Sequence, residues 1–144
     1  MMDESFLNAE DAKDSQKSLK REDEVSHAVI GAAVEVQRVL GTGLLESAYA
    51  AALAVELRER GLSFEREVPV PASYKGQMLG VAFRADFLVE RCVLLELKAV
   101  ELLTELHRAQ LLSYLRVSDL RLGLLINFHT FPVVKGVKRV VNQL

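Results

Sequence analysis

The segment from Val93 to Val100, VLLELKAV, constrains the fold more than any other part of the sequence. It is an apolar run of the kind that forms a buried strand, yet it holds one acid and one base two residues apart. Because side chains alternate between the faces of a strand, Glu96 and Lys98 must share one face. Burying a carboxylate and an ammonium group costs free energy unless each is paired or binds a cation. The strand therefore predicts a functional site.

A second strand-like run, RADFLV, precedes this one and carries another acid, Asp86. Glu90 and Arg91 indicate a turn between the two runs, so an antiparallel pairing would bring Asp86 beside Glu96 and Lys98. Two carboxylates can hold a divalent cation, and a lysine beside them can orient an attacking water and offset the charge of a phosphate. These are the requirements of metal-dependent phosphodiester hydrolysis. A cross-strand ion pair on an exposed sheet face would explain the same spacing.

Composition limits the class of protein. The chain has 144 residues, half of them hydrophobic, which is enough for one domain with a substantial core. A single cysteine, Cys92, excludes an internal disulfide framework and indicates a reducing compartment. No apolar run reaches the roughly 20 residues that a membrane span requires, and the polar, acidic N-terminus does not resemble a secretory signal. We therefore predict a cytoplasmic protein without a membrane partner.

Charge alone does not identify the partner. The formal net charge is −2, but many of the acids precede residue 25, so the remainder of the chain is slightly basic. Lys135, Lys138 and Arg139 could form a patch for nucleic acid or simply a solvated strand end. No helix-turn-helix or zinc-finger pattern is present, so the sequence indicates no particular target site.

Two helices are expected before the sheet. Residues 1–22 are polar with few apolar anchors, which predicts a disordered tail, and residues 23–144 form the expected domain. Apolar side chains recur at helical spacing from Glu24 to about Val39 and again from Leu45 to Arg60. The glycine turn at 41–43 separates these helices.

Strand-like and helical spacing then predict the other elements. Strands are expected over 64–70 with 72–74, 82–89, 92–99, 121–127 and 137–141, and a helix over 101–117. Pro69 and Pro71 favour an edge position for the first strand, and 75–77 reads as a hairpin turn. The helix can join two parallel strands in a sheet whose first strands are antiparallel. The predicted fold class is α/β, with a single-domain mixed sheet flanked by helices.

Polar residues on two helices are further candidates. Glu46 and Tyr49 lie three residues apart near the start of the second helix, where the helix dipole favours a carboxylate. They could belong to a site, or be a dipole-stabilising acid and a half-buried tyrosine. Gln110 and Tyr114 share a face of the third helix, with His107 on the same side. These side chains could cover the site or face solvent.

Five motifs, in this order along the chain, resemble those of the GxxExxY protein family, which is grouped with the PD-(D/E)xK nuclease-like superfamily. They are GLLESAY, RADFLV, LELKA, QLLSYL and GLLINF, and the similarity covers about residues 24–142. The resemblance implies a restriction-endonuclease-like core with the order αβββαβ. Ala85 stands where the superfamily has its eponymous proline, a difference that affects the stiffness of the backbone but not the chemistry.

The resemblance also implies roles for individual residues. Asp86 and Glu96 would bind the metal, and Leu97 would add its main-chain carbonyl. Lys98 would be the catalytic lysine. Glu46 resembles the extra glutamate that the superfamily contributes from a helix before the sheet, and is expected at the metal as well.

The later helix would supply substrate contacts. Gln110 and Tyr114 match the QxxxY element of the exonuclease-type branch, and with Tyr49 they are expected to bind substrate. The resemblance thus implies a nuclease that uses Mg²⁺ (or Mn²⁺) to hydrolyse phosphodiester bonds in DNA or RNA. The alternative is a catalytically silent module that keeps the nuclease fold and binds nucleic acid or protein.

Overall fold

The computed structural model describes the backbone of residues 9–143 and the side chains of residues 19–143. Its elements are α1 (Ala9–Leu40), α2 (Glu46–Glu59), β1 (Phe64–Tyr74), β2 (Gln77–Val89), β3 (Val93–Lys98), α3 (Glu105–Ser118), β4 (Leu122–Asn127), the short 3₁₀ helix η2 (Val133–Gly136) and β5 (Val137–Val141). Within the described residues the strands form one five-stranded sheet in the order β1-β2-β3-β4-β5. The β3–β4 pairing is parallel and the other pairings are antiparallel. The predicted α/β fold with a mixed sheet is confirmed, as is the edge position of β1.

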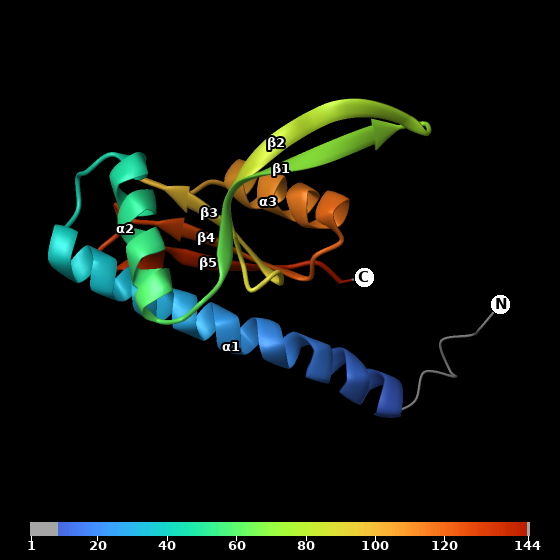
Figure 1. The fold of residues 1–144 in the computed structure, drawn as a ribbon, viewed down its shortest axis with the longest axis horizontal. Helices are drawn as coiled ribbons and strands as arrows, with labels where there is room; N and C mark the ends of the chain where they lie inside the picture. The colour runs from blue at the N-terminus through green and yellow to red at the C-terminus, as the bar shows by residue number, and fades with distance from the viewer. Residues whose placement is uncertain (1–8, 144) are drawn as a thin grey trace.

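Helices cover both faces of the sheet, because the strands are apolar on both sides. Leu95 and Leu97 of β3 are buried in the core that α1 and α2 form with the sheet, whereas Leu94 belongs to a second core with Leu111 and Leu115 of α3. The ribbon in Figure 1 shows α3 on the opposite side of the sheet from α1. By alternation along β3, Glu96 and Lys98 lie on the α3 face.

Helix α1 begins at Ala9, well before the start of the folded domain that was predicted at residue 23. The side chain of Arg21 donates a hydrogen bond to the carbonyl oxygen of Glu90 at 3.2 Å, which ties this part of α1 to the β2–β3 turn. The contact joins a charged side chain to a backbone group, so apolar spacing could not reveal it. Residues 1–8 of the predicted tail lie outside the described residues. No helix in the described part of the chain is long and apolar enough to cross a membrane.

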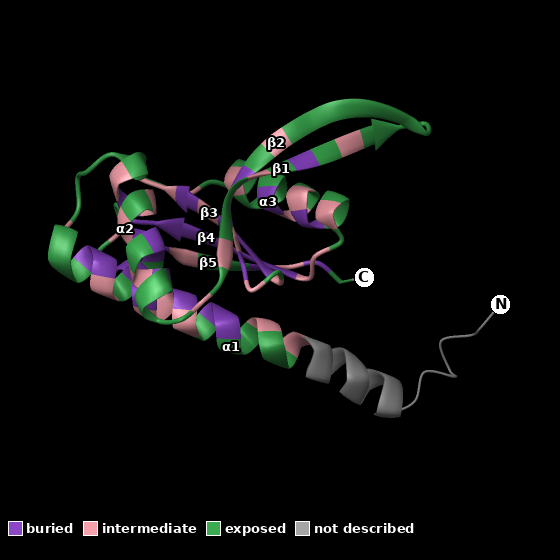
Figure 2. Cartoon of the chain, viewed as in Figure 1, coloured by how far each residue is buried: buried purple, intermediate pink, exposed green. Residues whose placement is uncertain are grey.

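Strands β1 and β2 continue far past the rest of the sheet. They pair with each other down to Tyr74 and Gln77, whereas β2 pairs with β3 only from Phe87 to Val89. Beyond Phe87 the hairpin leaves the sheet as a two-stranded ribbon, which Figure 1 shows projecting from the molecule and Figure 2 shows as largely exposed. We call residues 71–84 the arm. The turn was predicted correctly, but β2 is longer than the predicted strand because the outer residues bury nothing and so show no alternation.

The buried side chain of Gln37 fixes the loop after β4 to α1. Its Nε2 donates to the carbonyl oxygens of Phe128 at 3.0 Å and Thr130 at 2.7 Å. Its Oε1 accepts from the backbone N–H of Val133 at 2.7 Å. Buried backbone groups require such partners, so one glutamine satisfies three of them at once.

We expect Gln37→Ala to lower the free energy of unfolding by about 2 to 4 kcal/mol, because it leaves these backbone groups without partners. Urea denaturation followed by circular dichroism would measure the change. Gln143, which is exposed, provides the control: Gln143→Ala should change stability by no more than about 0.5 kcal/mol. A loss below about 1 kcal/mol for Gln37→Ala would show that the loop does not depend on this side chain.

Candidate active site

The ladder between β2 and β3 ends at the two predicted acids. Its last backbone pair is Phe87 with Leu95, and regular pairing would next join Asp86 to Glu96. Instead, the Asp86 N–H donates to Oε1 of Glu96 at 3.2 Å, and the Leu97 N–H donates to Oδ2 of Asp86 at 2.7 Å. Carboxylate oxygens take the place of the carbonyl acceptors that a ladder would supply. Each acid is thereby held in the gap where the strands separate.

Each of the two carboxylates keeps one oxygen for another ligand. Oε2 of Glu96 and Oδ1 of Asp86 make no hydrogen bond with the described residues, and neither is buried from solvent. The backbone bonds fix the orientation of both groups without using their full capacity to accept. The pair can therefore offer oxygen ligands from two strands to one bound group.

Burial raises the pKa of all three predicted acids. The pKa of Glu96 rises to about 8, mainly through burial and then through the charge of Asp86. Burial also raises the pKa of Asp86, although its bond from the Leu97 N–H opposes the change. For Glu46, burial and then the charge of Asp86 raise the pKa. Carboxyl groups in this situation favour a bound proton or a bound cation.

Lys98 and Glu46 are the other two predicted residues near Asp86 and Glu96. Lys98 is partly buried on the same strand face as Glu96, and its positive charge opposes the rise in the pKa of each acid. Glu46 is the exposed first residue of α2, and its pKa responds to both Asp86 and Lys98. The structure thus brings together the three acids and the lysine that the sequence singled out.

Comparison with known protein families identifies the chain. The PD-(D/E)XK nuclease superfamily matches residues 23–140, which include β1 to β4, most of β5, and Asp86, Glu96 and Glu46. The chain belongs to the PD-(D/E)XK nuclease superfamily. Comparisons with curated proteins and with solved structures gave no match. The predicted superfamily is confirmed, whereas the GxxExxY grouping within it stays a prediction.

Superfamily membership supports a nuclease-like function on a nucleic-acid substrate, and enzymes of this superfamily generally use divalent metals. Among the described residues, no three side chains of His, Cys, Asp or Glu are arranged to hold a metal ion. Glu46 therefore does not form a three-acid cage with Asp86 and Glu96, and its expected role at the metal stays a prediction. Mg²⁺, however, usually keeps several waters and takes only one or two carboxylates together with substrate phosphates. The Asp86–Glu96 pair fits such an ion.

Tyr49, which was expected to bind substrate, lies in the core instead. Its ring is fully buried and stacks on Phe128 with the ring centroids 4.7 Å apart. Its hydroxyl donates to the carbonyl oxygen of Gly41 at 2.7 Å and accepts from the Leu44 N–H at 3.2 Å. Tyr49 therefore holds the glycine turn that leads to Glu46. The spacing of the two residues did not show which side of the helix faces the sheet.

The QxxxY element lies on the side of the acids, but its residues differ in environment. Gln110 is exposed, whereas Tyr114 is partly buried and stacks on Phe83 of β2 with the ring centroids 3.3 Å apart. Burial, and then the charge of Glu96, raise the pKa of Tyr114, which places it within electrostatic reach of the site. His107 accepts a hydrogen bond from the backbone at the start of α3 and so caps that helix. Substrate binding by Gln110 and Tyr114 stays a prediction.

Asn127 was not predicted, yet it fixes the end of the strand that carries the lysine. It is the parallel partner of Lys98. Its Nδ2 donates to the Val100 carbonyl at 2.8 Å and to Oγ1 of Thr130 at 3.1 Å, and its Oδ1 accepts from the N–H groups of Val100 at 3.1 Å and His129 at 3.2 Å. The GLLINF motif contains this residue, but a polar residue at a strand end gives no sign of burial.

Charges on β1 also act on the site. The β1–β2 register pairs the residues on either side of Glu67 and Asp86 but skips these two. The charge of Glu67 raises the pKa of Asp86, whereas that of Arg66 lowers it. Glu67 has a φ of 53°, a region that residues other than glycine rarely adopt. Neither residue stood out in the sequence, because both lie in an exposed strand with mixed charges.

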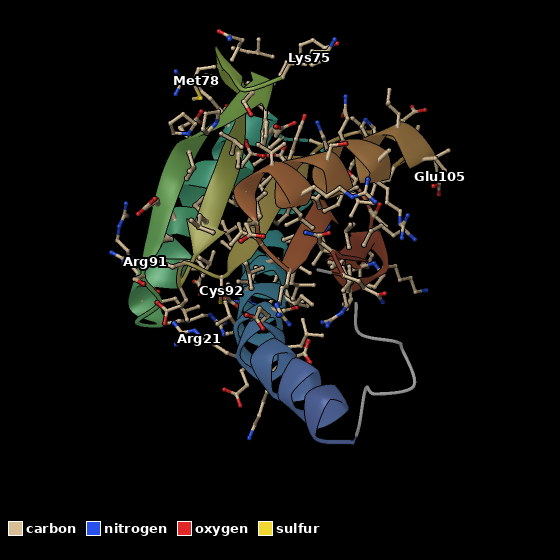
Figure 3. The ribbon with its side chains drawn as sticks, turned by 90° about the vertical axis from the view of Figure 1, so that its right-hand side faces the viewer. Arg21, Lys75, Met78, Arg91, Cys92 and Glu105 are labelled. Carbon is tan, nitrogen blue, oxygen red and sulfur yellow. The ribbon has the colours of Figure 1, made fainter. Side chains whose placement is uncertain are left out.

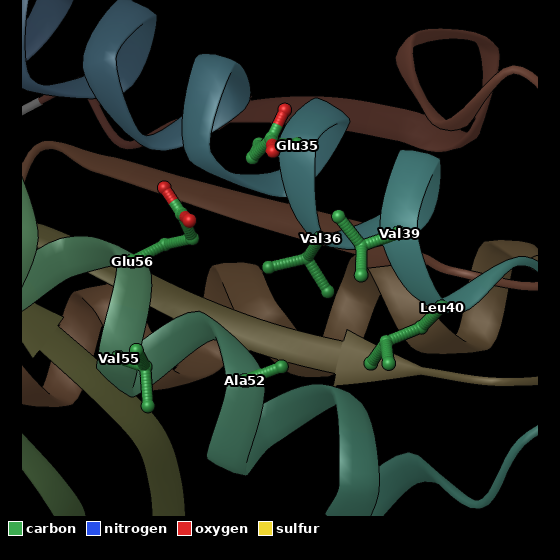
Figure 4. Close-up of a pocket in the computed structure, with 7 residues that line it drawn as sticks. All are labelled: Glu35, Val36, Val39, Leu40, Ala52, Val55 and Glu56. Carbon is green, nitrogen blue, oxygen red and sulfur yellow. The ribbon is translucent and has the colours of Figure 1, made fainter.

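A hollow of about 210 Å³ lies between α1 and α2 (Figure 4). Asp86, Glu96 and Glu46 are not among the residues that line it. It is lined by Glu35, Val36, Val39, Leu40, Ala52, Val55 and Glu56. Its charged side chains are two glutamates: Glu35 pairs with Arg38 of the same helix, and Glu56 pairs with Arg60, which follows the end of α2. With apolar walls and acidic residues, the hollow is unsuited to a phosphate-bearing substrate.

The raised pKa of Glu96 predicts that the metal-free protein loses stability as the pH rises. The folded protein retains on Glu96 a proton that the unfolded chain releases near pH 4.5. The free energy of unfolding should therefore fall between about pH 4.5 and pH 8 and level off above that range. One such group gives a slope of at most about 1.4 kcal/mol per pH unit. Urea denaturation in EDTA across this range would measure it.

Glu96→Gln isolates the contribution of this group, because glutamine does not titrate. The variant should show a flatter pH profile than the wild type and should be the more stable protein at pH 9. Glu59→Gln, which alters an exposed glutamate on α2, should keep the wild-type slope. Identical profiles for Glu96→Gln and the wild type would contradict the raised pKa.

Proposed function

We propose that the protein is a Mg²⁺-dependent nuclease that hydrolyses phosphodiester bonds in DNA, with Mn²⁺ able to replace Mg²⁺. The observation that carries the proposal is the end of the β2–β3 ladder, where Asp86 and Glu96 each bind a backbone N–H across the gap and keep one carboxylate oxygen accessible. Membership of the superfamily supports the reaction class.

The role proposed for each residue follows from its position in the candidate site. Asp86 and Glu96 would hold the cation, with the main-chain carbonyl of Leu97 as a third donor. When bound, the cation supplies positive charge that stabilises charge developing on the scissile phosphate and makes the attacking water more acidic. Lys98, on the same face, would donate hydrogen bonds to that water and to a phosphate oxygen. Glu46 would accept a hydrogen bond from water at the exposed side of the site.

Proton release should accompany binding of the cation. Because the pKa of Glu96 is about 8 in the metal-free protein, this carboxyl group carries a proton at neutral pH. A cation can use the group as a ligand only in its deprotonated form. The affinity for Mg²⁺ should therefore rise with pH up to about 8.

Mg²⁺ or Mn²⁺ should raise the melting temperature of the wild type, because a ligand that binds only the folded state stabilises it. A free concentration of ten times Kd gives about 1.4 kcal/mol, or a shift of about 5 °C for a chain of this size. Glu96→Gln should abolish the shift and Glu59→Gln should preserve it. Calorimetry at constant ionic strength would measure both, and a wild-type melting temperature that does not respond would contradict the site.

Cleavage assays on single- and double-stranded DNA and RNA, with Mg²⁺, Mn²⁺ or EDTA, test the reaction itself. Lys98→Ala and Glu96→Gln should each lower the cleavage rate at least about 100-fold, since each removes a group that acts on the reacting atoms. Lys20→Ala and Glu59→Gln alter exposed residues and serve as controls of matched charge. Cleavage of RNA but not of DNA would show that the substrate is RNA. Binding without cleavage would favour the non-catalytic alternative.

A further inference from the structure

The outer part of the arm packs against no other element of the described residues. All its outer residues from Ser73 to Ala82 are exposed, and Figure 3 shows Lys75 and Met78 at its tip, far from Arg21 and Cys92 at the opposite end of the molecule. A two-stranded hairpin that packs on nothing is at best marginally stable in water. A partner that covers the arm would therefore stabilise it.

The arm presents large apolar side chains to solvent. The exposed fraction is 61% for Tyr74, 72% for Met78, 64% for Leu79 and 54% for Val81. A monomeric protein rarely gathers apolar side chains on a projecting element unless they contact a partner. The ring of Tyr74 also carries the Lys75 ammonium 5.2 Å from its centroid, so the tip combines a flat apolar face with a positive charge.

The charge of this segment identifies the class of partner. From Val68 to Ala85 the sequence contains no acid, whereas it includes the exposed cations Lys75 and Arg84. An acid-free cationic ribbon is complementary to a polyanion. A second copy of the same arm would instead bring like charges together, which disfavours self-association.

The base of the arm adjoins the candidate site. Arg84 lies two residues before Asp86 on β2. Phe83, beside it, stacks on Tyr114 of α3, whose pKa responds to the charge of Glu96. A molecule lying along the arm therefore passes next to the acids, and the aromatic stack fixes the angle at which the arm leaves the sheet.

We propose that the arm binds duplex nucleic acid beside the scissile bond, with Lys75 and Arg84 on phosphates and the apolar tip in a groove. The major groove of B-form DNA, about 12 Å wide, admits a two-stranded β-ribbon. This inference rests on the proposed function, since it assigns the arm to the substrate of the same site. The arm contributes affinity and register, and the acids act on the bond that it presents.

Fluorescence anisotropy with a labelled DNA duplex, in Mg²⁺ and in a Lys98→Ala background that suppresses cleavage, tests the arm. Lys75→Ala and Arg84→Ala should each raise Kd at least about fivefold and reduce the slope of log Kd against log salt by about 0.9. Leu79→Ser should raise Kd at least about threefold without changing that slope, because it removes no charge. Melting temperatures should stay at the parent value, since these residues lie outside both cores.

Two control variants match these changes elsewhere on the surface. Lys20→Ala removes an exposed cation on α1, and Val39→Ser alters a side chain on the same helix that is 65% exposed, close to the 64% of Leu79. Both should bind as the parent does. Equal losses in the controls and the arm variants would overturn the inference, because binding would then follow total surface charge and apolarity.

The remaining outcomes separate the arm from the proposed function. If the wild type cleaves DNA and every arm variant keeps the parent Kd and salt slope, the arm inference fails and the proposed function stands. If the wild type neither binds nor cleaves any nucleic acid, both fail. If sedimentation shows a dimer that Leu79→Ser dissociates while Kd is unchanged, the arm is an interface between two copies and the inference is overturned.

Discussion

The arrangement of this protein depends on the point where carboxylates replace carbonyls as hydrogen-bond acceptors between β2 and β3. Asp86 and Glu96 satisfy the backbone N–H groups that the ladder abandons, so the strands can separate without leaving those donors unpaired. The separation has two results. It opens a gap that holds two acids at fixed orientation, and it frees β2 to leave the sheet with β1 as the arm. The candidate site and the arm thus share one structural cause.

Hydrogen bonds and ring stacking around the C-terminal ends of β3 and β4 provide the rigidity that such a gap requires. Gln37 and Asn127 hold the chain after β4 and after β3 through buried hydrogen bonds, and Tyr49 stacks on Phe128 between them. The same tyrosine bonds to the glycine turn that precedes Glu46. A site that must place groups to within a fraction of an ångström needs support of this kind. Polar residues that touch no substrate therefore govern the positions of those that would.

Elements with a regular spacing of apolar residues could be predicted from the sequence. The direction in which a helix face points, and the length of strands that bury nothing, could not. The acid and lysine of β3 were predictable because strict alternation in an apolar strand sets their common face. Tyr49 was misplaced because its spacing from Glu46 defines a helical face without saying where that face points. The length of the arm was underestimated because exposed strands show no pattern of burial. Asn127 was missed since buried and solvated amides look alike in a sequence.

Electrostatics explains why binding of a nucleic-acid substrate would need both the candidate site and the arm. Asp86, Glu96 and Glu46 outnumber the single lysine, Lys98, so the candidate site repels a polyanion unless protons or a cation offset the charge. Lowering the pH protonates Glu96 but also removes a ligand for the cation, so protons cannot substitute for metal in catalysis. Attraction toward nucleic acid must then come from outside the site. The acid-free hairpin that begins at the gap is where such attraction can act without weakening the affinity of the acids for their cation.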